Sequence, residues 1–154
     1  MPGKETSPAQ EAADLFDFSF NCAQSVLAAF TPRFSIPRRK ALKLASMLGG
    51  GVARRGQVCG AVSGGLLALG LGRGADDPAG KEAAYALGQV FLARFEERHG
   101  SLLCAELLDG DISTLEGRRL LRERGAFDRL CPTYVRHAAE IVEQLLMDKD
   151  DDPA

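Results

Sequence analysis

The sequence predicts an all-α, single-domain protein that folds as a bundle of about five to seven helices. Apolar residues recur at spacings of three and four along most of the chain, and the alternation typical of strands is nearly absent. Capping-box patterns, prolines and glycines mark the ends of these periodic segments. A length of 154 residues, 45% of them hydrophobic, suffices for one core and is short for two.

The first helix is predicted to begin at Ser7-Pro8-Ala9-Gln10, which has the form of a capping box with proline at the first helical position. Its apolar face comprises Phe16, Phe20, Ala23, Leu27 and Phe30. Thr31-Pro32 ends this helix. Cys22 lies beside the apolar face, so we expect its side chain to point into the bundle or along its seam.

A second helix is predicted from near Pro37 to the glycines at 49–51, and a loop over 52–56 leads into a helix that carries Cys59. No charge occurs between Arg55 and Arg73, but these 17 residues are fewer than the roughly 20 that a membrane span requires. We therefore predict a buried helix and no membrane span.

Small residues leave one face of this helix almost bare, which permits close packing within the chain or across a homodimer, or leaves space for a ligand. They are Gly60, Ala61, Gly64, Gly65 and Ala68.

Beyond a turn-rich connector over 70–80, a long helix is predicted from about Lys81 to Arg98, with Gly100 as its cap. His99, at its end, and His137 are interpreted as structural residues. A short helix that carries Cys104 follows, opened by Ser101 and closed by Asp109-Gly110.

The pattern Ser113-Thr114-Leu115-Glu116 predicts another short helix that ends at Gly125, and the final helix is predicted to begin at Cys131-Pro132. That position would place Cys131 at the N-cap, where the helix dipole favours a thiolate with a pKa of about 3.5 to 7.5 instead of 8.5. Cys131 is therefore the predicted reactive cysteine. The domain organisation predicted is a flexible N-terminus (1–6), a four-cysteine helical domain (7–147) and an acidic flexible tail (148–154).

A formal net charge of -2 and dispersed basic clusters predict no nucleic-acid partner. These clusters are Arg38, Arg39 and Lys40; Arg54 and Arg55; and Arg118 and Arg119. Residues 1–14 lack the apolar stretch of a secretory signal, so a cytoplasmic location with reduced thiols is expected. Four cysteines in that compartment favour metal or redox chemistry over structural disulfides.

The cysteines and their neighbours resemble the C_GCAxxG_C_C family of redox-active proteins over about 15–146. The matching segments are Asn21-Cys22-Ala23-Gln24, Gly49-Gly50-Gly51 before Cys59-Gly60-Ala61-Val62-Ser63-Gly64, Gly100-Ser101 ahead of Cys104, and Cys131-Pro132-Thr133-Tyr134-Val135-Arg136. The resemblance implies redox activity at the four cysteines. A similar domain occurs in split-Soret cytochromes, where it is associated with an iron–sulfur centre, but this chain lacks their CxxCH haem motif.

The leading hypothesis is an iron–sulfur cluster for electron transfer, bound by Cys22, Cys59, Cys104 and Cys131, with Gly60 and Gly64 leaving room for it. A second hypothesis is a dithiol/disulfide carrier in which Cys131 attacks and another cysteine, such as Cys59, resolves.

A closed zinc site with four thiolate ligands and a helical interaction module with buried structural thiols remain as alternatives. A redox reaction would require a partner protein or a small thiol. Arg54 and Arg55 could stabilise a thiolate at Cys59 or an anionic cluster, although loop arginines are usually solvated.

Overall fold

The computed structural model describes residues 5–148, which form eight α-helices and two short 3₁₀ helices without a β-strand. The α-helices are α1 (Pro8–Asp17), α2 (Cys22–Ala29), α3 (Arg38–Ala45), α4 (Gly60–Arg73), α5 (Lys81–His99), α6 (Cys104–Leu108), α7 (Leu115–Glu123) and α8 (Ala126–Met147). The 3₁₀ helices are Thr31–Arg33 and Pro78–Gly80. The all-α prediction is confirmed, with slightly more helices than expected. Most of the predicted flexible N-terminus and acidic tail lies outside the described residues.

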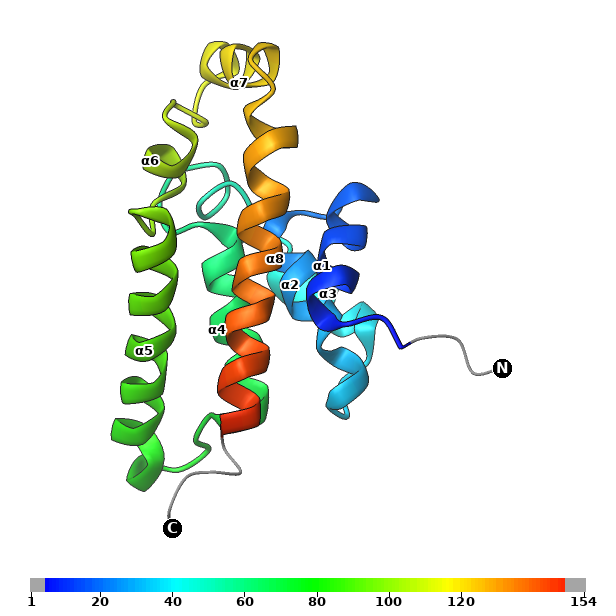
Figure 1. Ribbon diagram of the computed structural model, residues 1–154, viewed down its shortest axis with the longest axis vertical. Coiled ribbons are helices and arrows are strands. Elements are labelled where there is room, and N and C mark those ends of the chain that lie inside the picture. Colours follow the sequence, from blue (N-terminus) through cyan, green and yellow to red (C-terminus); the bar gives the residue numbers. More distant parts are fainter. Residues whose placement is uncertain (1–4, 149–154) are drawn as a thin grey trace.

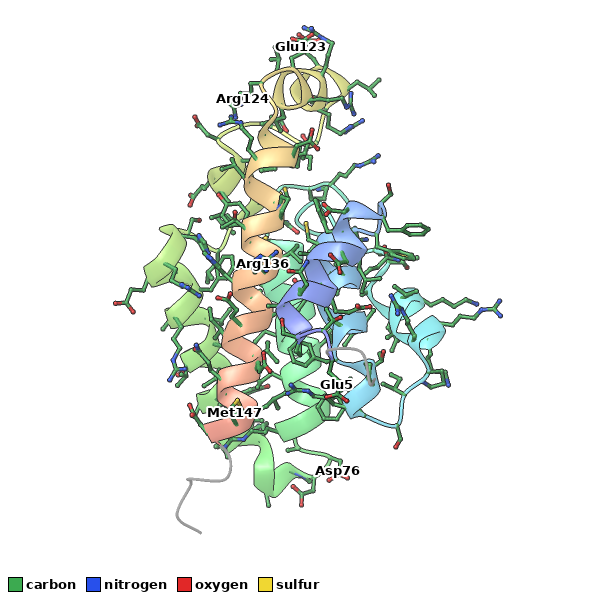
Figure 2. All side chains as sticks on the ribbon, turned by 45° about the vertical axis from the view of Figure 1, so that its right-hand side comes forward. Glu5, Asp76, Glu123, Arg124, Arg136 and Met147 are labelled. Atoms are coloured by element: carbon green, nitrogen blue, oxygen red, sulfur yellow. The ribbon has the colours of Figure 1, made fainter. Side chains whose placement is uncertain are left out.

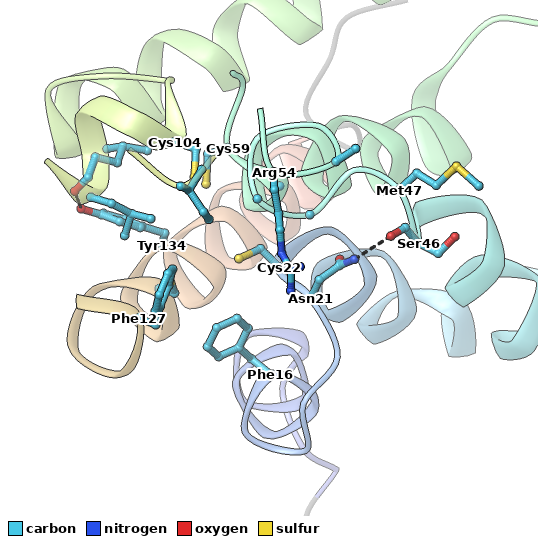
Figure 3. A pocket seen from close by; sticks show the side chains of 18 residues that line it. Phe16, Asn21, Cys22, Ser46, Met47, Arg54, Cys59, Cys104, Phe127 and Tyr134 are labelled. Atoms are coloured by element: carbon cyan, nitrogen blue, oxygen red, sulfur yellow. Dashed lines mark hydrogen bonds between the residues drawn. The ribbon is translucent and has the colours of Figure 1, made fainter. Parts of the chain in front are cut away.

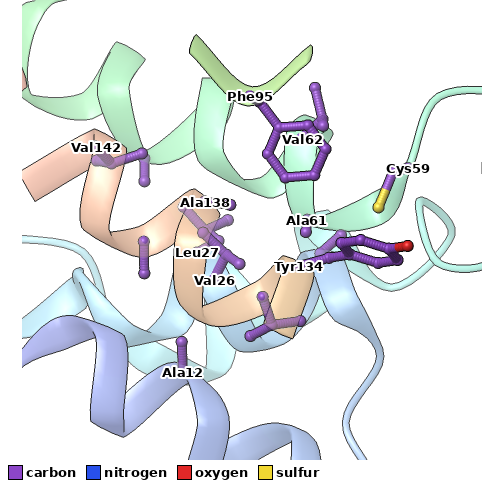
Figure 4. Close-up of a cluster of buried hydrophobic side chains, with 14 of the residues drawn as sticks. Ala12, Val26, Leu27, Cys59, Ala61, Val62, Phe95, Tyr134, Ala138 and Val142 are labelled. Atoms are coloured by element: carbon purple, nitrogen blue, oxygen red, sulfur yellow. The ribbon is translucent and has the colours of Figure 1, made fainter. Parts of the chain in front are cut away.

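Helix α8 runs through the middle of the molecule, and Figure 1 shows α4 and α5 on one side of it and α1, α2 and α3 on the other. Helices α6 and α7 lie at one end of α8. The core between these layers is well packed: Leu27, Phe95 and Val142 are almost completely buried, and each comes from a different helix (Figure 4). Within residues 5–148, no helix combines the length and apolar character that crossing a membrane requires.

Charged side chains lie around the outside of the bundle (Figure 2). Two ion pairs join helix α8 to its neighbours, Arg33 with Glu143 at 2.8 Å and Arg98 with Glu140 at 3.4 Å. Exposed pairs of this kind contribute at most about 1 kcal/mol each. The apolar core is therefore the main source of stability.

The predicted first helix is in fact two helices, α1 and α2. Ser7 caps α1 as expected, accepting a hydrogen bond from the Gln10 amide at 3.2 Å. The helix breaks at Ser19, whose φ of +83° is left-handed, and α2 starts from a capping box of its own. In it, the Asn21 side chain accepts from the Gln24 amide at 2.8 Å, and the Gln24 side chain accepts from the Asn21 amide at 3.0 Å. These local bonds replace those of a continuous helix.

The bare face of α4 lets α2 pack closely against it. A Cβ atom added to Gly64 would lie 2.6 Å from the carbonyl oxygen of Ala23 and 2.9 Å from its Cα, distances that no real side chain tolerates. This part of the small-residue face is thus used for packing within the chain. Helix α4 continues to Arg73, so the predicted connector over 70–80 is shorter than expected.

The last helix begins at Ala126 and not at Cys131, which corrects the predicted N-cap position of Cys131. Gly125, with a φ of +70°, precedes the helix, and Pro132 lies inside it. Proline has no N–H to donate to the carbonyl four residues earlier, but its fixed φ is compatible with a helix. The Cys-Pro pattern therefore marked an interruption in the hydrogen bonding of α8 and not its first turn.

Candidate functional site

The four cysteines come from four helices and line one cavity of about 510 Å³ (Figure 3). Cys22 and Cys104 are the first residues of α2 and α6, Cys59 is the N-cap of α4, and Cys131 lies in the second turn of α8. Cys22 is half-buried and the other three are buried. All four are free thiols. The fold thus brings together the cysteines that the sequence keeps far apart.

Cys59 and Cys104 are placed together by an isolated antiparallel bridge between Val58 and Leu103. The amide of each cysteine donates to a carbonyl of the opposite segment, at 2.8 Å for Cys59 and 2.7 Å for Cys104. Since side chains alternate along extended segments, the residues flanking the bridge point to one common face. The two thiols therefore share a face, and Figure 3 shows them next to each other.

Cys22 and Cys131 form a second pair, in which hydrogen bonding between the two side chains shifts their pKa values in opposite directions. This bond lowers the pKa of Cys131, against the opposing effects of burial and of the Asp128 carboxylate. The same bond, together with burial and the charges of the other cysteines, raises the pKa of Cys22 well above its ordinary value. Cys131 is therefore the cysteine most readily converted to a thiolate, but the cause is a neighbouring thiol and not a helix N-terminus.

The N-cap position predicted for Cys131 belongs to Cys59. Hydrogen bonds from the amides of Ala61 and Val62 lower the pKa of Cys59, but burial outweighs them and raises it to about 11. Burial, with the charges of Cys59 and Cys131, raises the pKa of Cys104 to about 12. Both are neutral thiols near pH 7, so a bound metal centre would have to displace their protons.

Glycines lie beside two of the cysteines, where a side chain would obstruct the site. A Cβ atom at Gly51 would lie 2.7 Å from the Cβ of Cys104, and one at Gly60 would lie 3.1 Å from the Cβ of Cys22. Gly60 lines the cavity. Gly64 does not line it and instead contacts α2, as described above.

Tyr134 is a cavity residue that the sequence analysis missed. Its hydroxyl donates to the carbonyl of Leu107 at 2.9 Å, which links α8 to α6 and therefore the helix of Cys131 to that of Cys104. Figure 4 shows its ring beside Cys59. Its spacing of three from Cys131 is the sequence signal that could have identified it, because such residues lie on one face of a helix.

A histidine pair lies next to Tyr134, outside the cavity lining. His137 Nδ1 is 3.0 Å from His99 Nε2, and the His99 ring meets the Tyr134 ring edge-on with centroids 4.9 Å apart. Burial, the charge of His137 and that of Arg98 lower the pKa of His99 to about 4, and burial also lowers the pKa of His137. Both rings are therefore neutral near pH 7. No sequence motif connects residues 38 positions apart.

Within residues 5–148, no group of three or more His, Cys, Asp or Glu side chains is arranged to bind a single metal ion. A closed zinc site, which needs four ligands around one ion, gains no support from this arrangement. An iron–sulfur cluster is different, because its thiolates bind separate irons and surround a larger group. A cluster of this kind needs four thiolates around it, and four thiols surround one glycine-lined cavity here.

Comparison with known proteins agrees with this site. The family model described as "Putative redox-active protein (C_GCAxxG_C_C)" matches residues 20–145, a range that contains all four cysteines. No curated protein and no solved structure matches the chain significantly. Because the family model covers most of the sequence, the chain belongs to the C_GCAxxG_C_C family.

Proposed function

We propose that the protein transfers electrons through an iron–sulfur cluster bound by Cys22, Cys59, Cys104 and Cys131. The observation that carries the proposal is that all four thiols line one cavity. Four cysteine thiolates are the usual ligands of both [2Fe–2S] and [4Fe–4S] centres. Membership of a redox-active family supports a redox role for these cysteines.

The cysteines form two pairs, which favours a [2Fe–2S] centre over a cubane. Cys22 is hydrogen-bonded to Cys131, and Cys59 shares a face with Cys104 beside the bridge. In a [2Fe–2S] centre each iron binds two protein ligands, so two pairs of thiols match its two irons.

The surrounding residues would position the cysteines and limit access by water. Tyr134 fixes α6 against α8, and Gly51 and Gly60 keep space beside Cys104 and Cys22. Apolar side chains line much of the remaining cavity: Phe16, Met47, Leu107, Leu108, Ile112 and Phe127. When bound, the cluster would supply a one-electron redox couple, and burial and nearby hydrogen-bond donors would set its potential.

Iron and acid-labile sulfide analysis of anaerobically purified protein tests the proposal. About two irons and two sulfides per chain are expected for a [2Fe–2S] centre. Replacing any of the four cysteines by alanine should abolish stable loading, whereas Thr133→Ser, an exposed position on α8, should leave it unchanged. Wild-type protein with no more iron and sulfide than a variant lacking all four cysteines would contradict the proposal.

A second candidate function, dithiol/disulfide exchange, is favoured by the bond between Cys22 and Cys131. The Cys131 thiolate would attack a disulfide and release one of its sulfurs as a thiolate. Cys22, after losing its proton, would then displace the second sulfur and leave a Cys22–Cys131 disulfide. The contact supports Cys22, instead of Cys59, as the resolving cysteine.

Oxidation of metal-free protein with oxidised glutathione, followed by alkylation and peptide mapping, tests this candidate. The expected product is a disulfide between Cys22 and Cys131. Cys59 and Cys104 should remain reduced and therefore become alkylated. A different pairing, or four reactive thiols after oxidation, would exclude it.

A further inference from the structure

We propose that the mouth of the cysteine cavity binds a small organic carboxylate, held by Arg54 and by the backbone amides of Gly49 and Gly50. This inference names a ligand class for the proposed redox site. It depends on the proposed function in one respect, that the cysteines are the reactive groups of the site.

Arg54 makes the cavity attractive to anions. Among the described residues that line the cavity, it alone carries a formal charge, and none is Asp or Glu. The Asp128 carboxylate acts on Cys131 from α8 but is not part of the lining. Figure 3 shows Arg54 extending from its turn toward Asn21 and Cys22. Within residues 5–148, Arg54 makes no ion pair with a carboxylate.

The turn that carries Arg54 has a costly backbone conformation. Gly50, Gly51, Val52, Ala53 and Arg54 have φ values of +66°, +68°, +66°, +49° and +62°, so five consecutive residues are left-handed. Each of the three that are not glycine costs about 1–2 kcal/mol in this region. Strain of this kind persists mainly at functional positions such as ligand sites.

The strained turn directs Arg54 back across the cavity. A Cβ atom at Gly50 would lie 2.9 Å from the Cγ of Arg54, so the arginine side chain passes directly over a glycine that lines the cavity. The same Cβ atom would lie 2.9 Å from the Cα of Arg54, so the turn requires glycine at this position.

The same turn leaves amide groups available. Within the described part of the chain, the amides of Gly49, Gly50 and Gly51 donate to no protein acceptor, whereas those of Val52 and Arg54 donate to carbonyls at 3.3 and 3.2 Å. Gly49 and Gly50 are both among the residues that line the cavity. Consecutive free amides beside a guanidinium form a favourable environment for an anion.

A carboxylate fits these donors better than a bulkier anion does. The planar guanidinium group binds a carboxylate through two parallel hydrogen bonds. The cavity of about 510 Å³ limits the ligand to a small molecule, and its apolar lining favours an organic body. A small carboxylate bearing a thiol or disulfide would bring its sulfur close to Cys22 and Cys131.

Two alkylating reagents of nearly equal size test the proposal, iodoacetate with a carboxylate and iodoacetamide with a neutral amide. In each reaction a cysteine thiolate forms a carbon–sulfur bond and iodide leaves. The experiment uses reduced full-length protein after metal removal and measures the rate at each cysteine by mass spectrometry. The readout is the iodoacetate-to-iodoacetamide rate ratio at Cys22 and Cys131, divided by the ratio for the same chain in urea.

We expect this normalised ratio to be about fivefold or more in the wild type, the factor that a single favourable charge contact provides. Arg54→Gln should lower it to about one while leaving the circular dichroism unchanged. Arg55→Gln, the exposed neighbour outside the cavity lining, should retain the wild-type ratio.

Salt provides a second measurement that needs no variant. Raising sodium chloride from about 0.01 M to 1 M should lower the wild-type ratio toward one, because salt screens the charge of Arg54. A wild-type ratio of about one, or equal losses in the Arg54 and Arg55 variants, would overturn the proposal. Iron and sulfide content is measured separately, so failure of the carboxylate site and failure of the cluster are distinguishable.

Discussion

At the scale of single residues, the two cysteine pairs differ in their protonation. Burial keeps Cys59 and Cys104 neutral, with pKa values of about 11 and 12. In the other pair, the hydrogen bond from Cys22 lowers the pKa of Cys131. Nucleophilic reactivity in metal-free protein should therefore be concentrated at Cys131.

Replacing Cys22 by alanine should raise the pKa of Cys131, because the variant removes the hydrogen bond that stabilises its thiolate. The pH dependence of Cys131 alkylation, followed by mass spectrometry, measures this shift. Cys104→Ala is the matched control, since Cys104 is not among the groups that shift the pKa of Cys131. Superimposable pH profiles for wild type and Cys22→Ala would contradict the assignment.

Replacing Tyr134 by phenylalanine should lower the free energy of unfolding by about 1 kcal/mol, because the carbonyl of Leu107 loses its hydrogen-bond donor. For a chain of this size, the melting temperature should fall by about 2–4 °C. Thermal unfolding of metal-free protein measures the change. Tyr85→Phe, at a residue that is 62% exposed, should have no comparable effect. Equal melting temperatures for the two variants would show that the Tyr134 hydroxyl does not stabilise the fold.

At the scale of helices, close contacts between backbones determine how the cysteines are positioned. Helix α4 packs against α2 through Gly64 and presents Cys59 and Gly60 to the cavity. Helix α5 is joined to α8 near the site by the pair His99 and His137. Changes at these contacts should alter stability and the arrangement of the site together.

Two glycine-to-alanine changes in α4 should have opposite effects. Gly64→Ala should destabilise the protein by about 1–3 kcal/mol, since the new methyl group would collide with the backbone of Ala23. Gly70→Ala meets no atom within 4 Å and should stabilise the helix by up to about 1 kcal/mol. Urea unfolding compares the two variants. A Gly64→Ala protein as stable as Gly70→Ala would show that the close approach of α2 and α4 is not needed.

Acid should weaken the contact between α5 and α8. The pKa of His99 is about 4 in the folded protein, compared with about 6.5 in an unfolded chain. Between these values the unfolded chain binds more protons, so stability should fall as pH decreases from about 6.5 to about 4. The urea midpoint, measured across this range, should depend less on pH in His99→Gln than in the wild type. Identical pH dependences would exclude His99 as the source.

At the scale of the whole molecule, the cavity connects four helices that are distant in sequence. A cluster bound only by the folded chain would stabilise the fold, because ligand binding to the native state shifts the unfolding equilibrium. Anaerobic loading should therefore raise the melting temperature, and chelation should reverse the increase. A variant without the four cysteines should melt at the same temperature with or without iron and sulfide. If loading left the wild-type melting temperature unchanged, the cluster would not link these helices.

Local sequence signals predicted much of the architecture correctly. Ser7 caps α1, and Gly100, with a φ of +84°, ends α5 as expected. The errors occurred where two local signals competed. The capping box at Asn21 interrupted a continuous apolar stripe, and Pro132 was read as a helix start although Gly125 already begins α8. Proline is favoured in the first turn of a helix and unfavourable inside one, so the sequence pattern alone favoured the wrong position.

The amino-acid sequence by itself determined the helical class, most helix ends, the family and the four cysteines that form the candidate site. These properties follow from periodicity, capping and short motifs, which depend on neighbouring residues. Only the tertiary structure decided that Cys22 pairs with Cys131, that Tyr134 links their helix to α6, and that Arg54 reaches the cavity mouth. Such contacts join residues far apart in the chain, so they depend on how the helices pack and no local pattern encodes them.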